Sequence, residues 1–427
     1  MAHPADPSAP AALTRSRPFL AFWAGQGISQ LGVQLGQIAL PVLAVQLLGA
    51  GELELGMLNA AAMAAFLVIG LPAGAWVDRW LKRRTMIAAD LVRMAAMLAV
   101  PALWAAGVLE LWHLYAVAAV LGVATVFFDV AYQSYIPLLV APALVPAANG
   151  RLEATAQVAR LGGPALGGAF LTVLSAPLLF LAEGLGYLAS ALFLTRVTDS
   201  ETPHSRAPGS RLAAEIREGA AFVVRHPLIR RVALSTAGFN LFSSLVFVLV
   251  PLVVLRELDL GPLGLGLILS VGSVGGIVAA LAVPRLAALA GEGPLIPLGA
   301  LMGAAATVLL PVSLGVRGVG ALVLLCAAEA LMAFGVVVYN VMQVSMRQRV
   351  CPTGLLGRMN ASIRFFVWGV MPLGSLAGGW LGENLGIGPA LWIGVAGQAL
   401  ASLPVVLGPF FALRTLPDTV DDAASLR

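Results

Sequence analysis

The chain has 427 residues, of which 59% are hydrophobic and 11% are charged, and its formal net charge is +4. A soluble globular chain has about 25% charged residues and interrupts its apolar runs every few residues. The composition therefore excludes a soluble globular protein, and the long apolar runs predict an all-α integral membrane protein. The cations are scattered between these runs, so we expect no nucleic-acid partner.

The chain begins with a short polar tail followed by the first apolar run. Residues 1–17 form the tail, and the run after it continues for about thirty residues without the small-residue cleavage site of a secretory signal. We therefore interpret the run as a first membrane span and the tail as a cytoplasmic extension.

Charged clusters and turn residues divide the rest of the chain into about twelve spans. In the first half we expect them at 18–48, 53–77, 84–107, 111–139, 150–174 and 176–197. In the second half we expect them at 228–255, 262–287, 293–315, 318–346, 357–383 and 387–413. This spacing predicts one six-helix bundle over 18–197, a second over 228–414, and a cytoplasmic tail over 415–427.

One long hydrophilic stretch, residues 198–227, separates the two predicted bundles. It begins with TDSETPHSRAPGSR, a composition typical of a flexible linker. It continues with RLAAEIREGAAFVVRHP, whose apolar residues repeat at helical spacing. We expect this second part to form an amphipathic helix on the inner face of the membrane.

The cations mark one side of the predicted spans. They concentrate in the tail, in the linker and in alternate loops, while the opposite loops contain only Arg256 and Arg317. The positive-inside rule therefore predicts that both termini and the linker are cytoplasmic. Lys82 is the only lysine, a bias typical of a GC-rich bacterial genome, so we expect a bacterial inner membrane.

The two halves align with each other at a nearly constant shift. At 210 residues, four positions in the first half match four in the second: Pro41 with Pro251, Gly56 with Gly266, Gln133 with Gln343, and Pro142 with Pro352. At 211 residues, Asn149 matches Asn360, and Gly167 and Gly168 match Gly378 and Gly379. Parallel repeats of this kind are a recognised transporter architecture, with the substrate site between the halves.

The loop after the second span, GAWVDRWLKRR, resembles the loop signature of the major facilitator superfamily. The residues that fit it are Gly74, Asp78, Arg79, Lys82 and Arg83. Leu81 stands where the signature has its second glycine. The resemblance implies a cytoplasmic gate in which Asp78 caps or salt-links a neighbouring helix end. The alternative is that the basic residues only fix the topology.

The fifth span resembles the antiporter signature of the drug-efflux branch of that superfamily. The residues that fit it are Gly150, Gly163, Pro164, Gly167 and Gly168. Ala159 replaces one glycine of the signature. Small residues let helix backbones approach closely, so the span should present a kinked, smooth seam to a neighbour. The alternative is ordinary helix packing without a gating role.

Three longer stretches resemble the enterobactin-exporter and macrolide-efflux group more narrowly. They are REGAAFVVRHPLIRR, IPLLVAPALVPAANG and GRMNASIRFFVWGVMPLGSLAGGWLG. The similarity runs from residue 17 to residue 414. It implies a twelve-span transporter that exports its substrate by alternating access.

Polar side chains inside the spans are candidates for the substrate cavity. The glutamines of span one repeat every three or four residues and therefore share one helix face. The resemblance implies that spans one, four, seven and ten line the cavity. The candidates on these spans are Gln26, Gln30, Gln34, Gln133, Asn240, Tyr339, Asn340 and Gln343. The alternative role for such residues is hydrogen bonding between packed helices.

Three ionisable residues lie deep in the predicted spans and are candidates for proton coupling. Asp129 and Arg160 lie at similar depths on adjacent spans, so we expect them to pair, either functionally or as a static clamp. Glu329 has no cation in its own span and shares a helix face with Asn340 and Gln343. We therefore expect Glu329 to face the cavity and to be the better proton carrier.

These observations predict proton-coupled export of a hydrophobic or amphipathic small molecule, such as a drug, a siderophore or a secondary metabolite. An uptake carrier or lipid flippase of the same fold is the alternative, followed by a membrane protein without transport activity. The expected partners are protons, membrane lipid and the substrate, with the protein as a monomer. No zinc-protease motif or phosphate-binding loop occurs, so we expect no catalytic residue, metal or cofactor.

Overall fold

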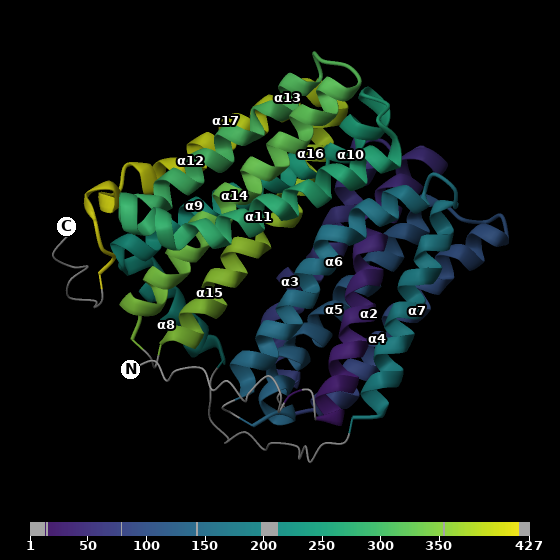
Figure 1. The fold of residues 1–427 in the computed structure, drawn as a ribbon, viewed down its shortest axis with the longest axis horizontal. Coiled ribbons are helices and arrows are strands. Elements are labelled where there is room, and N and C mark those ends of the chain that lie inside the picture. Colours follow the sequence, from purple (N-terminus) through teal and green to yellow (C-terminus); the bar gives the residue numbers. More distant parts are fainter. Residues whose placement is uncertain are drawn as a thin grey trace.

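The structure is a computed structural model that describes residue 13 and residues 16–77, 79–141, 144–197, 212–352 and 355–417. Within these residues all regular secondary structure is helical. The helices form two bundles that meet at one end of the molecule and diverge toward the other (Figure 1). We call the end at which α8 (Leu212–Arg225) lies the linker end, and the opposite end the far end.

The first bundle contains the helices of the N-terminal half. They are α2 (Arg17–Val42) with the π-helical turn η1 (Leu43–Leu47), α3 (Glu52–Val77), α4 (Lys82–Ala105), α5 (Leu111–Leu139), α6 (Val145–Phe170) and α7 (Ala176–Thr195). Helix α6 packs against α2 within this bundle and against α11 of the other bundle.

The second bundle contains the helices that follow α8. They are α9 (Pro227–Phe247), α10 (Val250–Leu252) with the π-helical turn η3 (Val253–Glu257), α11 (Gly261–Ala290), α12 (Leu295–Thr307), α13 (Leu309–Ser313), α14 (Val319–Val350), α15 (Leu356–Gly369), α16 (Met371–Leu385), α17 (Ile387–Val406) and η4 (Pro409–Ala412). Helices α15 and α16 together form one span.

Eleven of the described helical segments are long and apolar enough to cross a membrane. Helix α6 is not among them, because the charges of Arg151, Glu153 and Arg160 and its glycines lower its hydropathy. Its 26 residues nevertheless extend about 39 Å at about 1.5 Å per residue, enough to span a bilayer. The predicted all-α membrane fold with about twelve spans in two bundles is therefore confirmed.

The internal repeat appears in the backbone at the far end. After Pro41, the amide of Leu48 donates to the carbonyl of Leu43 at 3.1 Å, in the wide turn η1. After Pro251, the amide of Leu258 donates to the carbonyl of Val253 at 2.9 Å, in the wide turn η3. Proline removes a helical donor and crowds the preceding turn, so each span is interrupted near the same position.

Apolar packing also joins the two bundles at the far end. One cluster of buried apolar side chains contains residues of η1, such as Leu43, together with residues of η3, such as Val253. Two other clusters belong to one bundle each: one surrounds Met346 and the other surrounds Tyr135. The bundles are therefore held together at the far end, which leaves room between them at the linker end.

Helix α8 belongs to the predicted linker, of which residues 198–211 lie outside the described part of the chain. Glu218 of α8 forms an ion pair with Arg358 of α15. Gly219 lets the α8 backbone approach the carbonyl of Arg358 closely, because a Cβ at this position would clash with it. The amphipathic helix thus packs against the second bundle as well as following the linker.

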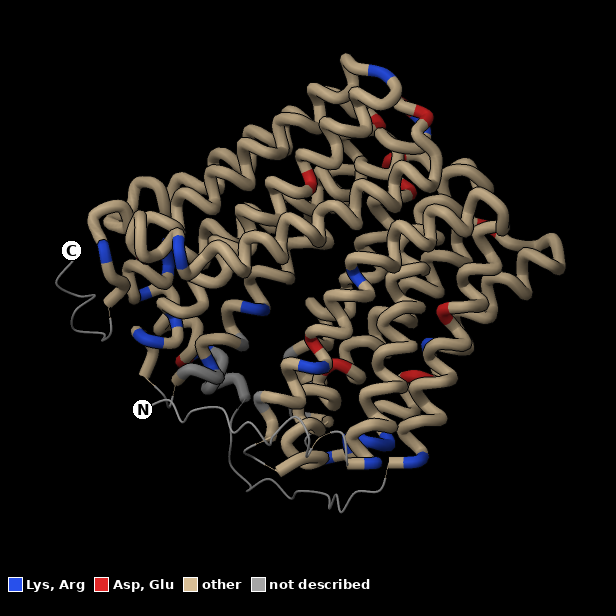
Figure 2. Tube along the Cα trace, in the orientation of Figure 1, with Lys and Arg blue, Asp and Glu red and all other residues tan. Residues whose placement is uncertain are grey.

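Charge is distributed unevenly along the molecule. Figure 2 shows most lysines and arginines at the linker end of both bundles, and few at the far end. The positive-inside rule would make the linker end cytoplasmic, and this orientation stays a prediction.

Candidate functional site

The glycines of α6 form two different contacts. Gly163 and Gly167 face α2, and a Cβ at Gly167 would lie 3.4 Å from the carbonyl oxygen of Leu35. Gly168 faces the other bundle, where its Cβ would lie 2.5 Å from the carbonyl oxygen of Pro262 in α11. The predicted seam of small residues therefore packs within its own bundle and also against the second one. Gly150, by contrast, has nothing within 4 Å of a Cβ position.

The same contact recurs at the other side of the far end. A Cβ at Gly379 of α16 would lie 2.6 Å from the carbonyl oxygen of Glu52, at the start of α3. Since Pro262 is the repeat counterpart of Glu52, the Gly168 and Gly379 contacts are equivalent. A Cβ at Gly56 would lie 2.7 Å from the carbonyl oxygen of Ser375. Two pseudo-symmetric glycine seams thus close the far end.

Gly266 completes this arrangement. A Cβ there would clash with the carbonyl of Pro164, so the α6 and α11 backbones touch at this point. An ion pair adds a polar contact between the bundles, with Arg256 Nη1 3.4 Å from Glu52 Oε1. Nη2 of the same guanidinium donates to the backbone carbonyl of Ala50 at 2.8 Å. The far end is therefore closed in this conformation.

Two adjoining cavities of about 510 and 610 Å³ lie between the bundles on the linker side. Five residues line both of them: Phe66, Val344, Arg347, Arg364 and Trp368. The smaller cavity includes the predicted residues Asn240, Asn340 and Gln343. The larger one includes Asp129 and Gln133 of α5, so it joins side chains of both bundles.

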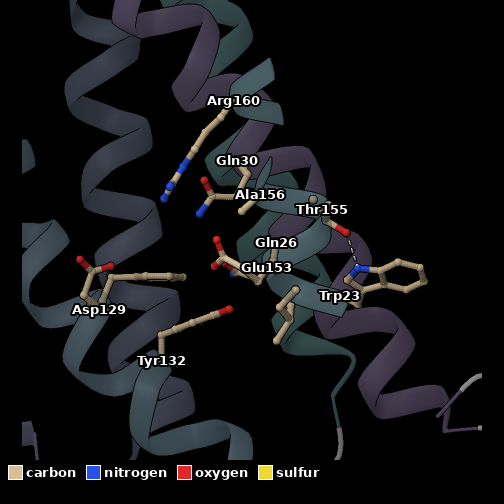
Figure 3. Close-up of a pocket in the computed structure, with 12 residues that line it drawn as sticks. Trp23, Gln26, Gln30, Asp129, Tyr132, Glu153, Thr155, Ala156 and Arg160 are labelled. Carbon is tan, nitrogen blue, oxygen red and sulfur yellow. Dashed lines mark hydrogen bonds between the residues drawn. The ribbon is translucent and has the colours of Figure 1, made fainter. Parts of the chain in front are cut away.

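A third cavity of about 140 Å³ lies within the first bundle (Figure 3). Gln26 and Gln30 of α2 line it together with Glu153 of α6, and Trp23 donates a hydrogen bond of 2.8 Å to Thr155 at its edge. Asp129 lines this cavity as well as the larger central one. Asp129 is therefore the acid that borders both spaces.

The expected ion pair between Asp129 and Arg160 is not formed in this conformation. Both side chains border the small cavity, with Arg160 extending toward it from α6 (Figure 3). Among the described residues, neither side chain has a hydrogen bond or an ion pair to the other. The physical reason is that α5 and α6 face each other across this cavity, where water can solvate the exposed guanidinium.

Glu329 occupies a different place from the one expected. It is 7% exposed, and its carboxylate lies between α14 and Gly272 of α11, where a Cβ at Gly272 would be 3.5 Å from Oε2. No hydrogen bond or ion pair to Glu329 occurs in the described part of the chain. Glu329 therefore does not line any of the three cavities above, where it was expected. As expected, no cation pairs with it among the described residues.

Two other predicted cavity residues serve helix packing in this conformation. The hydroxyl of Tyr339 lies 2.7 Å from that of Thr236 and donates to the carbonyl of Val232 at 3.2 Å, which joins α14 to α9. Gln34 is buried beneath Gly163 of α6. The alternative of interhelical contact therefore describes these two side chains better than cavity lining.

The predicted cytoplasmic gate is only partly visible. Asp78 lies outside the described residues, and Gly74 lies within α3. Arg83 donates to the carbonyls of Leu194 and Thr195 at 2.8 and 2.7 Å, at the end of α7. A cation at a helix C-terminus stabilises the free carbonyls there. Arg83 thus ties two helices of one bundle together, while Arg79 is exposed and Lys82 is buried.

Sequence reasoning missed a buried charged cluster in the first bundle. Arg93 forms an ion pair with Asp90 in the preceding turn of α4, and both side chains are almost completely buried. The guanidinium lies over the rings of Phe128 and Tyr187, at 4.0 and 4.5 Å from their centroids. The spacing of three residues between an acid and a base was the available signal.

Glu183 of α7 extends this cluster. It is 4% exposed and accepts a hydrogen bond of 2.9 Å from the hydroxyl of Tyr187. Its other carboxylate oxygen occupies the place where a Cβ at Gly36 of α2 would stand. The cluster therefore links α2, α4, α5 and α7 away from the central cavities.

A family model described as a transmembrane secretion effector, MFS_3, matches residues 8–425. The chain belongs to the MFS-type transporter family. This MFS-type transporter is 26% identical over 209 residues to the uncharacterized MFS-type transporter YfiS of Bacillus subtilis strain 168. That match covers 48% of this chain and 49% of the relative, so it spans about half the length of the curated relative.

Solved transporters share the fold of this MFS-type transporter. A bacterial homologue of the iron transporter ferroportin, in its inward-facing state, has a TM-score of 0.74 at 17% identity and covers 93% of this chain and 99% of its own. The nucleoside transporter NupG has a TM-score of 0.72 at 12% identity, over 91% of this chain and 98% of its own.

The same homologue in another state is less similar in backbone. In its outward-facing state the ferroportin homologue gives a lower TM-score of 0.58, at 18% identity over 91% of this chain and 98% of its own. In this chain itself, glycine seams close the far end and cavities lie toward the linker end.

Proposed function

We propose that this MFS-type transporter is a proton-coupled exporter of an amphipathic small molecule in a bacterial inner membrane, with both termini cytoplasmic. One observation carries the proposal. A cavity shared by both bundles lies toward the linker end, while glycine seams close the far end. Such a conformation receives substrate from the linker end. To release the substrate, the transporter must close the linker end and open the far end.

The lining of the cavity supports an amphipathic substrate. Phe66 and Trp368 contact each other edge to face, with ring centroids 5.3 Å apart. Asn340 and Gln343 are hydrogen-bonded to each other at 3.2 Å beside them. Apolar walls with a few polar groups are typical of small-molecule sites. The substrate could be a drug, a siderophore or a secondary metabolite.

Two carboxylates support proton coupling. Asp129 borders the cavity of both bundles, where water and substrate can reach it. Glu329 is buried between α11 and α14 of the second bundle, and α11 also forms the far-end contact with α6. An acid that is exposed to water in one conformation and buried in the other binds and releases a proton during the cycle.

Purified protein in proteoliposomes with an imposed pH gradient tests the coupling. We expect a panel of fluorescent amphipathic dyes to be moved uphill only while the gradient persists. Asp129→Asn or Glu329→Gln should abolish uphill movement while dye binding persists. Glu383→Gln, which changes an exposed carboxylate on α16, is the matched control and should behave like the wild type. Uphill movement with an unchanged pH dependence in both variants would contradict the coupling.

The orientation can be tested separately in intact cells. A single cysteine at Ser205, in a variant lacking Cys326 and Cys351, should resist impermeant thiol reagents added outside. Rapid labelling would show that the linker lies outside the cell. It would then favour the alternative functions, an uptake carrier or a lipid flippase.

A further inference from the structure

We propose that the central cavity binds an organic anion with an aromatic or apolar body, and that Arg347 and Arg364 hold its carboxylate. This inference rests on the proposed function, because it names the class of molecule that the transport cavity receives. From the sequence alone, Arg347 only fits the positive-inside pattern, and Arg364 could pair either with the cytoplasmic gate or with an anionic group.

The first observation is the place of the two arginines. Arg347 comes from α14 and Arg364 from α15, and both line both adjoining cavities. Two helices of one bundle therefore direct two cations to a single space. Arginine binds a carboxylate through two parallel hydrogen bonds, so a pair of arginines forms a specific site for such a group.

The second observation is that neither guanidinium has a charged or hydrogen-bonding partner among the described residues. In the part of the chain that the structure describes, neither one forms an ion pair or a hydrogen bond with another residue. The Nε atom of Arg347 is buried and lacks a partner. A buried donor without a partner is costly, and a ligand that accepts its hydrogen bond removes the cost.

The third observation is the balance of charge. Asp129 is the one carboxylate among the described residues that line these two cavities, against two arginines. While the cavity is open, water screens the excess positive charge. When the linker end closes, this charge is dehydrated, and an unpaired cation inside the bilayer is costly. A ligand with one negative charge neutralises the closed cavity.

The fourth observation identifies the rest of the ligand. The guanidinium of Arg364 lies 5.8 Å from the ring centroid of Trp368, which contacts Phe66 of the other bundle. Met63 and Met371 add flexible apolar surface to the same wall. An aromatic body would stack here while its carboxylate reaches the arginines. A purely cationic or purely hydrophilic solute would fit this wall poorly.

Equilibrium binding to purified protein in detergent tests the inference with three compounds that share a naphthalene ring and carry a negative, a neutral or a positive one-carbon substituent. They are 2-naphthoate, 2-naphthylmethanol and 2-naphthylmethylammonium, measured by equilibrium dialysis. We expect naphthoate to bind at least about tenfold more tightly than the alcohol, and the ammonium compound to bind most weakly. Binding of the alcohol as tightly as naphthoate, or preference for the ammonium compound, would overturn the inference.

Variants locate the effect. Arg347→Gln and Arg364→Gln should each reduce naphthoate binding about tenfold and leave the alcohol unchanged, so the alcohol reports folded protein in the same sample. Arg364→Lys should keep part of the preference. Arg285→Gln, at an exposed arginine of α11 outside these cavities, is the matched control and should bind like the wild type. Equal loss of both ligands would reduce the arginines to a structural role.

The outcome separates this inference from the proposed function, because equilibrium binding needs neither a pH gradient nor transport. Charge-selective binding without uphill transport would sustain the anion site and remove the proton-coupled exporter. Uphill transport of neutral dyes without selectivity for naphthoate would sustain the proton-coupled exporter and remove the anion site.

Discussion

The two bundles share a backbone plan but differ in the charges they carry. The wide turns after Pro41 and Pro251 and the seams at Gly168 and Gly379 are nearly equivalent. The charged side chains are not equivalent. At the shift of 211 residues, Glu153 of the first bundle corresponds to Arg364 of the second.

The difference extends to how the charges are accommodated. In the first bundle Arg93 is buried and paired with Asp90, beside Glu183. In the second, Arg347 and Arg364 line the central cavities without such partners among the described residues. Small residues at equivalent positions therefore close the far end, whereas the charges at the cavities differ between the two bundles.

The largest expected effect comes from removing the buried cation of the first bundle. Arg93→Gln leaves the Asp90 carboxylate buried without its partner, and breaking a buried pair costs about 3–5 kcal/mol. We expect a marked loss of folded yield and of thermal stability in detergent. Arg364→Gln removes a cation that water already solvates, so its folded yield should match the wild type. Equal losses in the two variants would erase the contrast between the bundles.

A double change sharpens this prediction. Asp90→Asn together with Arg93→Gln removes both charges, so we expect it to recover part of the yield that Arg93→Gln loses. The stacking of Arg93 on Phe128 and Tyr187 is not restored, so the recovery should be incomplete. No recovery at all would mean that ring stacking, not charge, keeps Arg93 in place.

The next effect concerns the glycine seams at the far end, which are equivalent in the two bundles. Gly168→Val and Gly379→Val should each overpack one far-end seam, at a cost of about 1–3 kcal/mol, and shift the protein toward opening by about fivefold or more. A cysteine at Ser375, in a variant lacking Cys326 and Cys351, should then react faster with impermeant reagents. Gly162→Val is the matched control, because nothing lies within 4 Å of that position. A response to only one valine would show that the seams are not equivalent.

The smallest effect concerns a turn at the linker end of the second bundle. Arg349 binds both carboxylate oxygens of Glu292 at 2.8 and 2.9 Å, and these hydrogen bonds lower the pKa of Glu292. At the shift of 210 residues, Glu292 corresponds to Lys82 of the first bundle. The sign of the charge is therefore inverted at this pair of positions, as it is at Glu153 and Arg364. Glu292→Gln should lower the free energy of unfolding at pH 7 by about 0.5–1 kcal/mol.

The pH dependence follows from the lowered pKa. The stabilisation is present above the unfolded pKa of about 4.3 and is lost as the pH falls through the folded value. Thermal unfolding of wild type and Glu292→Gln should therefore differ at pH 7 and converge well below pH 4.3. Glu257→Gln, at an exposed carboxylate of the far end, should show no such difference. A gap that persists in acid would assign the effect to packing.

The spans could be predicted closely because hydropathy and turn residues mark them directly. The expected span 111–139 coincides with α5. Helix α6 begins at Val145, earlier than the expected residue 150, because Pro146 is favourable in the first turn of a helix. The last span ends sooner than expected, since α17 stops at Val406, just before Gly408 and Pro409. Hydropathy sets where a helix must begin and end, but proline chemistry adjusts the boundary by a few residues.

The candidate site could be predicted only in part, because a helix face does not reveal its neighbour. Glu329, Asn340 and Gln343 share a face of α14, yet of the three only Asn340 and Gln343 line the central cavities described above. Nearer the far end, α11 covers the same face with Gly272. Arg347 was missed because a cation near the end of a span fits the topology rule as well as a binding role.

The contact between Gly36 and Glu183 has a consequence for how this sequence can vary. One oxygen of the Glu183 carboxylate fills the space that any side chain at position 36 would require. A relative with alanine or a larger residue at position 36 must move or shorten the acid opposite it. We therefore expect the two positions to change together during divergence, although position 36 and position 183 are 147 residues apart in the chain.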